Sequence, residues 1–133
     1  MDFISNNIWL VMLALVSGGM LLWPMLRRGA EVTPQEAVML VNHAHALVLD
    51  VREDAEFAQG HIADARHIPL GQLASRIGEL EKWKDKAIVV NCQGGVRSAK
   101  ACAVLRRHGF AQVNNLSGGI AAWQNAKLPV TKD

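Results

Sequence analysis

A short loop in the second half of the chain carries the residues best suited to covalent chemistry. It contains Cys92, Gln93, Gly94, Gly95, Val96, Arg97 and Ser98. Two glycines permit a tight curl that turns successive N–H groups inward, and a helix expected after the loop adds its positive end. Arg97 adds a permanent cation. Because each of these features stabilises a sulfur anion, Cys92 is predicted to be a nucleophile with a pKa below the roughly 8.5 of a free cysteine.

The remaining cysteine and histidine content argues against metal chemistry. Cys102 lies in an apolar helical run and is expected to pack in the core. None of the five histidines has the paired cysteine or the His–Glu spacing of a zinc site. We therefore expect neither a metal site nor a disulfide framework, in keeping with a reducing compartment. The alternative for Cys92 is a buried structural cysteine in a glycine turn, which would leave Arg97 without a role.

The amino-terminal segment predicts a membrane location. A run of nineteen residues without charge begins at Ile8 and ends at Leu26, and a helix needs about 20 apolar residues to span a bilayer. A cleaved signal peptide is the alternative, but no basic residue precedes the run. Arg27 and Arg28 follow it, and basic flanks favour the cytoplasmic side. We expect a non-cytoplasmic tail over residues 1–7, a span in the lipid bilayer over residues 8–26 and a cytoplasmic domain after it.

Helices and strands alternate along the rest of the chain. After a linker over residues 27–32, Thr33 and Glu36 have the spacing of a capping box around a first-turn proline, which predicts a helix to about residue 43. Apolar runs and turn residues predict strands over residues 46–51, 65–69, 87–91 and 112–116. Further helices are expected over residues 53–59, 70–80, 98–108 and 120–125.

This alternation predicts an α/β domain with a parallel sheet and helices on both of its faces. Ligands bind beyond the carboxyl ends of the strands in such sheets, and Asp50, Cys92 and Ser117 all lie at expected strand ends. The residues after the linker are enough for one domain. Basic and acidic residues are interleaved and the formal net charge is only +2, which argues against nucleic-acid binding.

Three segments in this order resemble the rhodanese family. They are Leu49-Asp50-Val51-Arg52-Glu53 with Gly60-His61-Ile62, the loop from Cys92 to Arg97, and Leu116-Ser117-Gly118-Gly119-Ile120-Ala121-Ala122-Trp123. The resemblance implies a three-layer α/β/α domain over residues 33–133 with a mostly parallel central sheet. With the preceding transmembrane helix, the whole chain resembles the membrane-anchored single-domain rhodaneses of bacteria, so we expect a single-pass protein of the bacterial inner membrane.

The resemblance implies a sulfurtransferase that carries sulfane sulfur as a Cys92 persulfide, without a cofactor. The donor would be a small sulfur compound such as thiosulfate, and the acceptor a thiol or cyanide. Cys92 and Arg97 would be catalytic, and Arg97 would either bind the anionic donor or brace the loop. The substrate-binding residues would be Gln93, Gly94, Gly95, Val96 and Ser98, chiefly through backbone N–H groups. Gln93 departs from the basic residue frequent at this position, which weakens the expectation of a strong thiosulfate preference.

Three further residues are expected to support the site. Asp50 and Arg52 are interpreted mainly as a structural ion pair, and direct participation is the alternative. His61 is interpreted as a hydrogen-bonding anchor of its turn, and a role as acid or base is the less favoured interpretation.

Two other functional classes remain open. One is a noncatalytic rhodanese-fold module that docks a membrane or sulfur-trafficking partner, and the sequence does not identify such a protein. The other is a phosphatase or arsenate reductase of the related fold. Four residues separate Cys92 from Arg97, one fewer than in the related phosphatase loop, which favours the smaller sulfur substrate.

Overall fold

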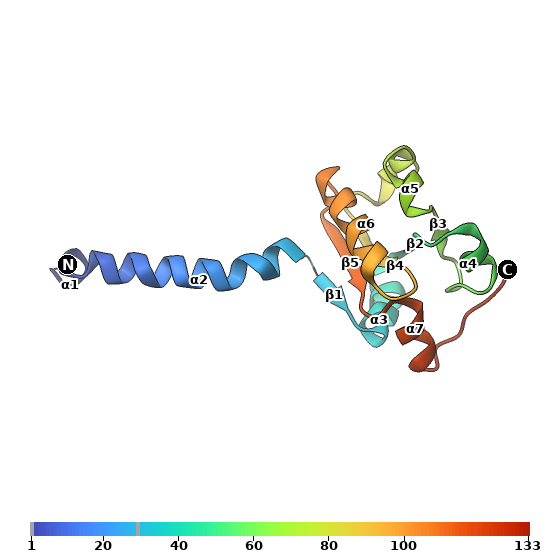
Figure 1. Ribbon diagram of the computed structural model, residues 1–133, viewed down its shortest axis with the longest axis horizontal. Coiled ribbons are helices and arrows are strands. Elements are labelled where there is room, and N and C mark those ends of the chain that lie inside the picture. The colour runs from blue at the N-terminus through green and yellow to red at the C-terminus, as the bar shows by residue number, and fades with distance from the viewer. Residues whose placement is uncertain (1, 29) are drawn as a thin grey trace.

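Two helices precede the sheet, α1 (Asp2–Asn6) and α2 (Ile8–Arg28). The computed structural model describes the backbone of residues 2–28 and 30–133 and the side chains of residues 4–19 and 31–133. In Figure 1, α2 is a long helix that extends away from the sheet. Within these described ranges, no helix is both long enough and apolar enough to cross a membrane. The predicted span from Ile8 to Leu26 lies partly outside the described side chains, so it stays a prediction.

The centre of the domain is a five-stranded sheet in the order β1-β5-β4-β2-β3. All of its neighbouring strands run parallel, which confirms the predicted parallel α/β architecture. The strands are β1 (Ala30–Val32), β2 (Leu47–Asp50), β3 (Arg66–His67), β4 (Ala87–Asn91) and β5 (Gln112–Leu116).

Five helical segments connect the strands and a sixth, α7, follows β5. They are α3 (Pro34–Ala44), α4 (Asp54–Ala58), α5 (Leu70–Leu73), the 3-10 helix η1 (Ile77–Trp83), α6 (Val96–Arg107) and α7 (Gly119–Asn125). The capping box at the start of α3 is confirmed, because the Thr33 hydroxyl accepts the Glu36 N–H at 3.1 Å. The Glu36 carboxylate in turn faces the Thr33 N–H, so both orphan donors are satisfied.

Two elements differ from the sequence prediction. Residues 30–32, expected within a linker, form the edge strand β1, which gains its ladder from β5 rather than from any apolar pattern of its own. The single helix expected over residues 70–80 is instead α5 followed by η1. Its apolar residues are three or four apart, which suits a 3-10 helix as well as an α-helix, and Gly71 and Gly78 weaken a continuous α-helix.

Alternate residues of the strands build two separate cores, one on each face of the sheet. Leu49, Ile88 and Val90 face α5, η1 and α6, where Leu73, Leu80 and Leu105 are buried. Val48 and Val89 face the opposite side, where α3 and α7 contribute Ala37, Ile120 and Trp123. This period-two alternation is the signature of a strand covered on both faces. The sheet is therefore the middle layer of three, as predicted.

Candidate functional site

β4 carries Cys92 to the carboxyl edge of the sheet. Every residue of β4 is buried, and Cys92 directly after it is only 1% exposed. Gly95 then adopts φ +101° as the residue before α6, a conformation that a side chain disfavours. This turn folds the chain back over the sulfur and points the first turn of α6 at it.

The loop surrounds the Cys92 sulfur with hydrogen-bond donors. The Gly95 N–H donates to Sγ at 3.0 Å, and the Ser98 hydroxyl oxygen lies 3.3 Å from Sγ. Burial by itself raises the pKa of the thiol. The Ser98 hydroxyl and the N–H groups of Ser98, Gly95 and Gly94 counteract burial, and the net pKa lies below the ordinary value. Hydrogen bonds to the charged form have this effect, so the geometry favours a thiolate.

Cys102 differs from Cys92 although it lies on the same helix that follows the loop. It is 1% exposed within the apolar core beneath α6. Burial raises the pKa of its thiol to about 12. A thiol in this state is a poor nucleophile at neutral pH.

A polar chain extends from the sulfur to β5. The Ser98 hydroxyl donates to Asn115 Oδ1 at 2.6 Å, and Asn115 Nδ2 donates to the Gly95 carbonyl at 3.1 Å. Ser98 and Asn115 are both buried, with exposed fractions of 0% and 4%. Asn115 therefore connects the last strand to two points of the reactive loop.

Arg97 forms a two-pronged ion pair with Glu56 of α4. Its Nη1 and Nη2 donate to the two carboxylate oxygens at 2.6 and 2.8 Å. The Arg97 hydrogen bond lowers the pKa of Glu56 to about 2 and raises that of Arg97 itself. The described hydrogen bonds of the guanidinium thus go to Glu56 and not to the sulfur, and its effect on Cys92 is electrostatic.

Backbone N–H groups of α7 hold the first half of the loop. The Ile120 N–H donates to the Cys92 carbonyl at 2.8 Å and the Ala121 N–H donates to the Gln93 carbonyl at 3.3 Å. Gly119, at φ +60°, lies so close that a Cβ there would collide with these same carbonyl groups. Gly119 is required because backbone meets backbone at this point, whereas a Cβ at its neighbour Gly118 would lie 2.7 Å from the Ala122 Cβ.

Asp50 and Arg52 form a buried ion pair at the end of β2. Arg52 Nη2 donates to Asp50 Oδ2 and to the Gly60 carbonyl, each at 2.8 Å, and Asn91 Nδ2 donates to Asp50 Oδ2 at 3.2 Å. Asp50 is 0% and Arg52 3% exposed. These contacts connect β2, β4 and the turn after α4, which is a supporting arrangement.

His61 lies in the turn after α4 and contacts the carboxyl-terminal segment. Its main-chain N–H donates to the Thr131 carbonyl at 2.8 Å, and its ring stacks on the Phe57 ring with centroids 3.8 Å apart. Its ring nitrogens lie 3.0 Å from the Phe57 carbonyl and 2.8 Å from the main-chain oxygen of Asp133. These are the contacts of an anchor for the turn.

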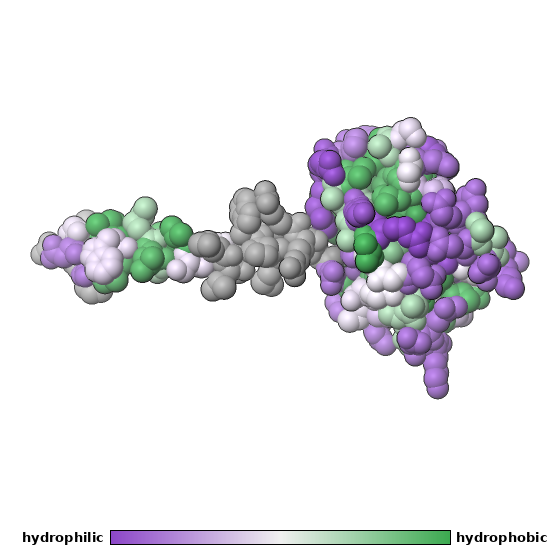
Figure 2. Space-filling model, viewed as in Figure 1, coloured by the Kyte–Doolittle hydropathy of each residue, from purple (hydrophilic) through white to green (hydrophobic). Residues whose placement is uncertain are grey.

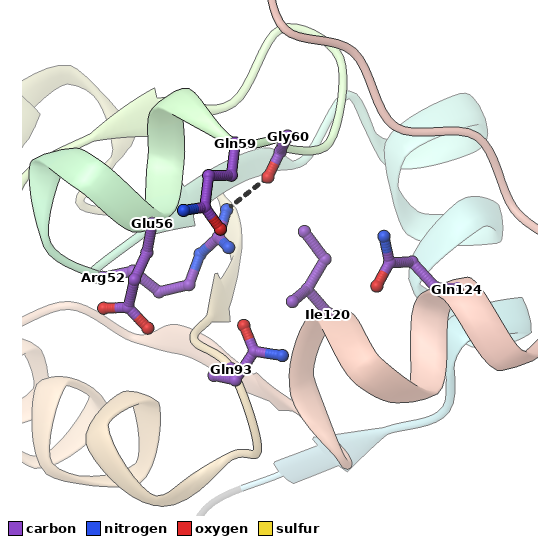
Figure 3. A pocket seen from close by; sticks show the side chains of 7 residues that line it. All are labelled: Arg52, Glu56, Gln59, Gly60, Gln93, Ile120 and Gln124. Atoms are coloured by element: carbon purple, nitrogen blue, oxygen red, sulfur yellow. Dashed lines mark hydrogen bonds between the residues drawn. The ribbon is translucent and has the colours of Figure 1, made fainter.

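A pocket of about 350 Å³ opens beside the reactive loop. Its lining residues are Arg52, Glu56, Gln59, Gly60, Gln93, Ile120 and Gln124. Figure 3 shows Gln93 rising from the loop between α4 and its following turn on one side and α7 on the other. The two charged residues of the lining are already paired, Arg52 with Asp50 and Glu56 with Arg97. The pocket therefore offers three glutamine amides without a net charge.

The predicted loop residues occupy different positions around the sulfur. Gly94 and Gly95 contribute backbone N–H groups, Ser98 contributes its hydroxyl, and Gln93 lines the pocket. Val96 is 71% exposed, so its side chain lies largely in solvent.

Sequence reasoning missed three participants, which are Glu56, Asn115 and Gln124. Asn115 left a usable signal, because an asparagine at a buried position of a strand must find polar partners. Glu56 and Gln124 lie on helix surfaces, where a polar residue is unremarkable, and only the tertiary structure brings them to the loop.

Comparison with known proteins gives a consistent result. The family described as Rhodanese-like domain matches residues 33–126. A protein named Sulfurtransferase from Allochromatium vinosum is 41% identical over 91 residues, which cover 68% of this chain and 83% of that protein. YibN of Escherichia coli K12 is 36% identical over 102 residues, covering 76% and 71%. The crystal structure of a rhodanese-related protein from Thermoplasma volcanium superposes with a TM-score of 0.71 at 32% identity, covering 78% and 99%.

Proposed function

The chain belongs to the rhodanese-like domain family, and from this premise we propose that it is a sulfurtransferase that carries sulfane sulfur on Cys92. The observation that carries the proposal is the environment of Sγ. It accepts the Gly95 N–H at 3.0 Å, and its pKa is lowered despite burial. A thiolate is the reactive form of cysteine, and the relative named Sulfurtransferase makes sulfur the expected element transferred.

The first half-reaction loads the cysteine. The Cys92 thiolate attacks the outer sulfur of a donor such as thiosulfate, and a new S–S bond forms as the donor S–S bond breaks. Sulfite leaves with the bonding electron pair. The negative charge of the persulfide then resides on its outer sulfur, where the N–H groups of the loop stabilise it. The donors of the loop and of Ser98 that lower the pKa of Cys92 favour the thiolate, so the proposed step uses no separate general base.

The second half-reaction returns the enzyme to its thiolate. An acceptor thiolate or cyanide attacks the outer sulfur, and the Cys92 thiolate leaves with the electron pair of the broken S–S bond. The pocket beside Gln93 gives the body of a thiol acceptor a place to bind. Its glutamine amides suit a polar molecule with amide groups, whereas cyanide is too small to use them. Two sequential displacements of this kind predict ping-pong kinetics.

The experiment that tests the proposal is intact-mass analysis before and after thiosulfate. We expect the wild-type protein to gain one sulfur atom. Cys92→Ser should gain none, whereas Cys102→Ser should still gain it, because Cys102 is a buried thiol with a pKa of about 12. Equal loss in both folded variants would contradict a single-cysteine mechanism. Hydrolysis of p-nitrophenyl phosphate without any gain of sulfur would point to oxyanion chemistry instead, and neither reaction would point to a binding module.

We further propose that α2 anchors the domain in a bacterial inner membrane, with the domain in the cytoplasm. The run from Ile8 to Leu26 has no charge and Arg27 and Arg28 follow it. Large apolar side chains on the described part of α2 are exposed, among them Trp9 at 64% and Leu15 at 67%. Figure 2 shows green, apolar side chains on the described part of α2, whereas purple, polar side chains predominate on the face of the domain in view. A helix with this much exposed apolar surface is stabilised by an apolar environment.

Fractionation and a topology reporter test the anchor. We expect the full chain to stay in the membrane pellet after alkaline carbonate extraction. A reporter fused after Asp133 should be active in the cytoplasm. Release by carbonate would contradict the span, and a reporter active only in the periplasm would contradict the orientation.

A further inference from the structure

The Ser98 hydroxyl lies between two groups that both need its proton. Its oxygen is 3.3 Å from Cys92 Sγ and 2.6 Å from Asn115 Oδ1. All three residues are at most 4% exposed, so bulk water does not replace a missing donor. A hydroxyl carries a single proton. It can therefore be given to the sulfur or to the asparagine, but not to both.

The second bond of Asn115 fixes which of its atoms faces Ser98. Nδ2 donates to the Gly95 carbonyl at 3.1 Å, so the acceptor Oδ1 is turned toward the hydroxyl. Rotating the amide by half a turn would set Oδ1 against the Gly95 carbonyl and lose this bond. Because Oδ1 only accepts, the contact of 2.6 Å requires the Ser98 proton.

We propose that Asn115 competes with the Cys92 sulfur for the single hydroxyl proton of Ser98 and is thereby a positioning residue for the reactive cysteine. While Cys92 is a neutral thiol, S–H donates to Ser98 and Ser98 donates to Asn115, so every proton has an acceptor. When the thiol ionises, the sulfur becomes a hydrogen-bond acceptor. The Ser98 hydroxyl, however, still donates its proton to Asn115.

The catalytic cycle gives this competition a purpose. The negative charge lies on Sγ in the free thiolate and on the outer sulfur in the persulfide. A hydrogen bond from the Ser98 hydroxyl to Sγ therefore stabilises the free thiolate. In the persulfide Sγ is no longer charged, and the hydroxyl can donate to Asn115 instead. A proton with two acceptors, exchanged by rotation of one C–O bond, therefore lets the site follow the charge without moving the backbone. No atom or electron is transferred in this rotation.

The other ionisable groups near the sulfur are not altered by substituting Ser98 or Asn115. Arg97 interacts electrostatically with Cys92 and is paired with Glu56, and Cys102 lies along the same helix. None of them contacts Ser98 or Asn115 through a described hydrogen bond. A change in the ionisation of Cys92 on substituting Asn115 is thus attributable to the hydroxyl proton.

The test is a double-mutant cycle on the pH profile of Cys92 alkylation by iodoacetamide. Ser98→Ala should raise the apparent pKa of Cys92 by about one unit, since a hydrogen bond to a charged group is lost. Asn115→Ala should lower the pKa, because the hydroxyl is freed for the sulfur. In the Ser98→Ala background, Asn115→Ala should change nothing, because the contested proton is absent.

Asn115→Leu keeps the branched shape of the side chain but is larger, so it provides a second variant that creates no cavity, with the same shift expected. A raised pKa in both Asn115 variants would overturn the proposal, since it would show that Asn115 only braces the loop. Equal shifts with and without Ser98 would also overturn it. The inference rests on the proposed sulfur transfer, but the alkylation of Cys92 can be measured whether or not the protein transfers sulfur. If the protein gained no sulfur from thiosulfate, the proposed function would be contradicted, and the pH profile of alkylation would still test the role of Asn115.

Discussion

Both terminal nitrogens of the Arg97 guanidinium donate to the Glu56 carboxylate, at 2.6 and 2.8 Å. The loop cation and the pocket carboxylate therefore neutralise each other beside the reactive sulfur. The side chains are 34% and 33% exposed, so solvent screens the pair and its contribution to global stability is modest. Its main effect is on the local charge beside the loop.

Substituting Glu56 tests this charge balance. Glu56→Gln keeps the shape of the side chain and removes the negative charge, leaving Arg97 to attract the donor. Two charges about 4 Å apart in water interact by about 1 kcal/mol, so kcat/KM for thiosulfate should rise about fivefold. Transfer from an uncharged persulfide donor should change much less. Glu79→Gln, which removes a carboxylate paired with Arg76, is the matched control, and a parallel fall for both donors would instead assign the pair to bracing the loop.

The same pair predicts the acid behaviour of the loop. The folded-state pKa of Glu56 is about 2, below its ordinary value of 4.5. A lowered carboxyl pKa stabilises the fold fully above 4.5, and this contribution is lost as the pH falls through about 2. The Glu56 carboxyl resonance should therefore not titrate between pH 6 and pH 4 in an NMR experiment. Arg97→Ala should return its midpoint toward 4.5, and an unchanged midpoint would contradict the ion pair.

The close approach of α7 to the loop predicts a strong effect of a small substitution. Gly119→Ala would place a Cβ against the Cys92 carbonyl and 2.7 Å from the Gln93 carbonyl, at a φ of +60°. We expect a loss of at least about 2 kcal/mol in unfolding free energy and a large loss of sulfur transfer. Thermal melts and turnover measure both. Gly94→Ala is the control, because a Cβ there meets nothing within 4 Å; equal damage from both variants would refute the contact.

The amide-lined pocket predicts a difference between acceptors. Gln124→Ala removes one amide from the lining and leaves the loop intact. For a peptidic thiol such as glutathione, KM should rise two- to tenfold, as expected for the loss of one neutral hydrogen bond. For cyanide it should stay constant, because cyanide does not reach the amide. Steady-state kinetics with both acceptors make the comparison, and an equal change for cyanide would contradict thiol binding in this pocket.

Local patterns predicted most of the secondary structure, and long-range contacts explain what they missed. The bounds of β4 and β5 and the capping box of Thr33 follow from near-neighbour chemistry. β1 forms because it pairs with β5, and the sequence of residues 30–32 has no pattern that predicts this pairing. In the sequence, the glycine turn and Arg97 indicate Cys92 as the candidate nucleophile. Glu56 and Asn115 lie 36 residues before it and 23 after it, and they meet the loop only in the folded chain.

The contacts between α7 and the loop also determine when the loop can take its folded shape during synthesis. The Cys92 and Gln93 carbonyls are bound by N–H groups of Ile120 and Ala121, and Asn115 joins the loop from the last strand. A nascent chain that has exposed Cys92 at the ribosome still lacks all of these partners. It therefore lacks the contacts that fix the loop from outside, and the loop reaches its folded geometry around the sulfur only when nearly the whole domain has emerged.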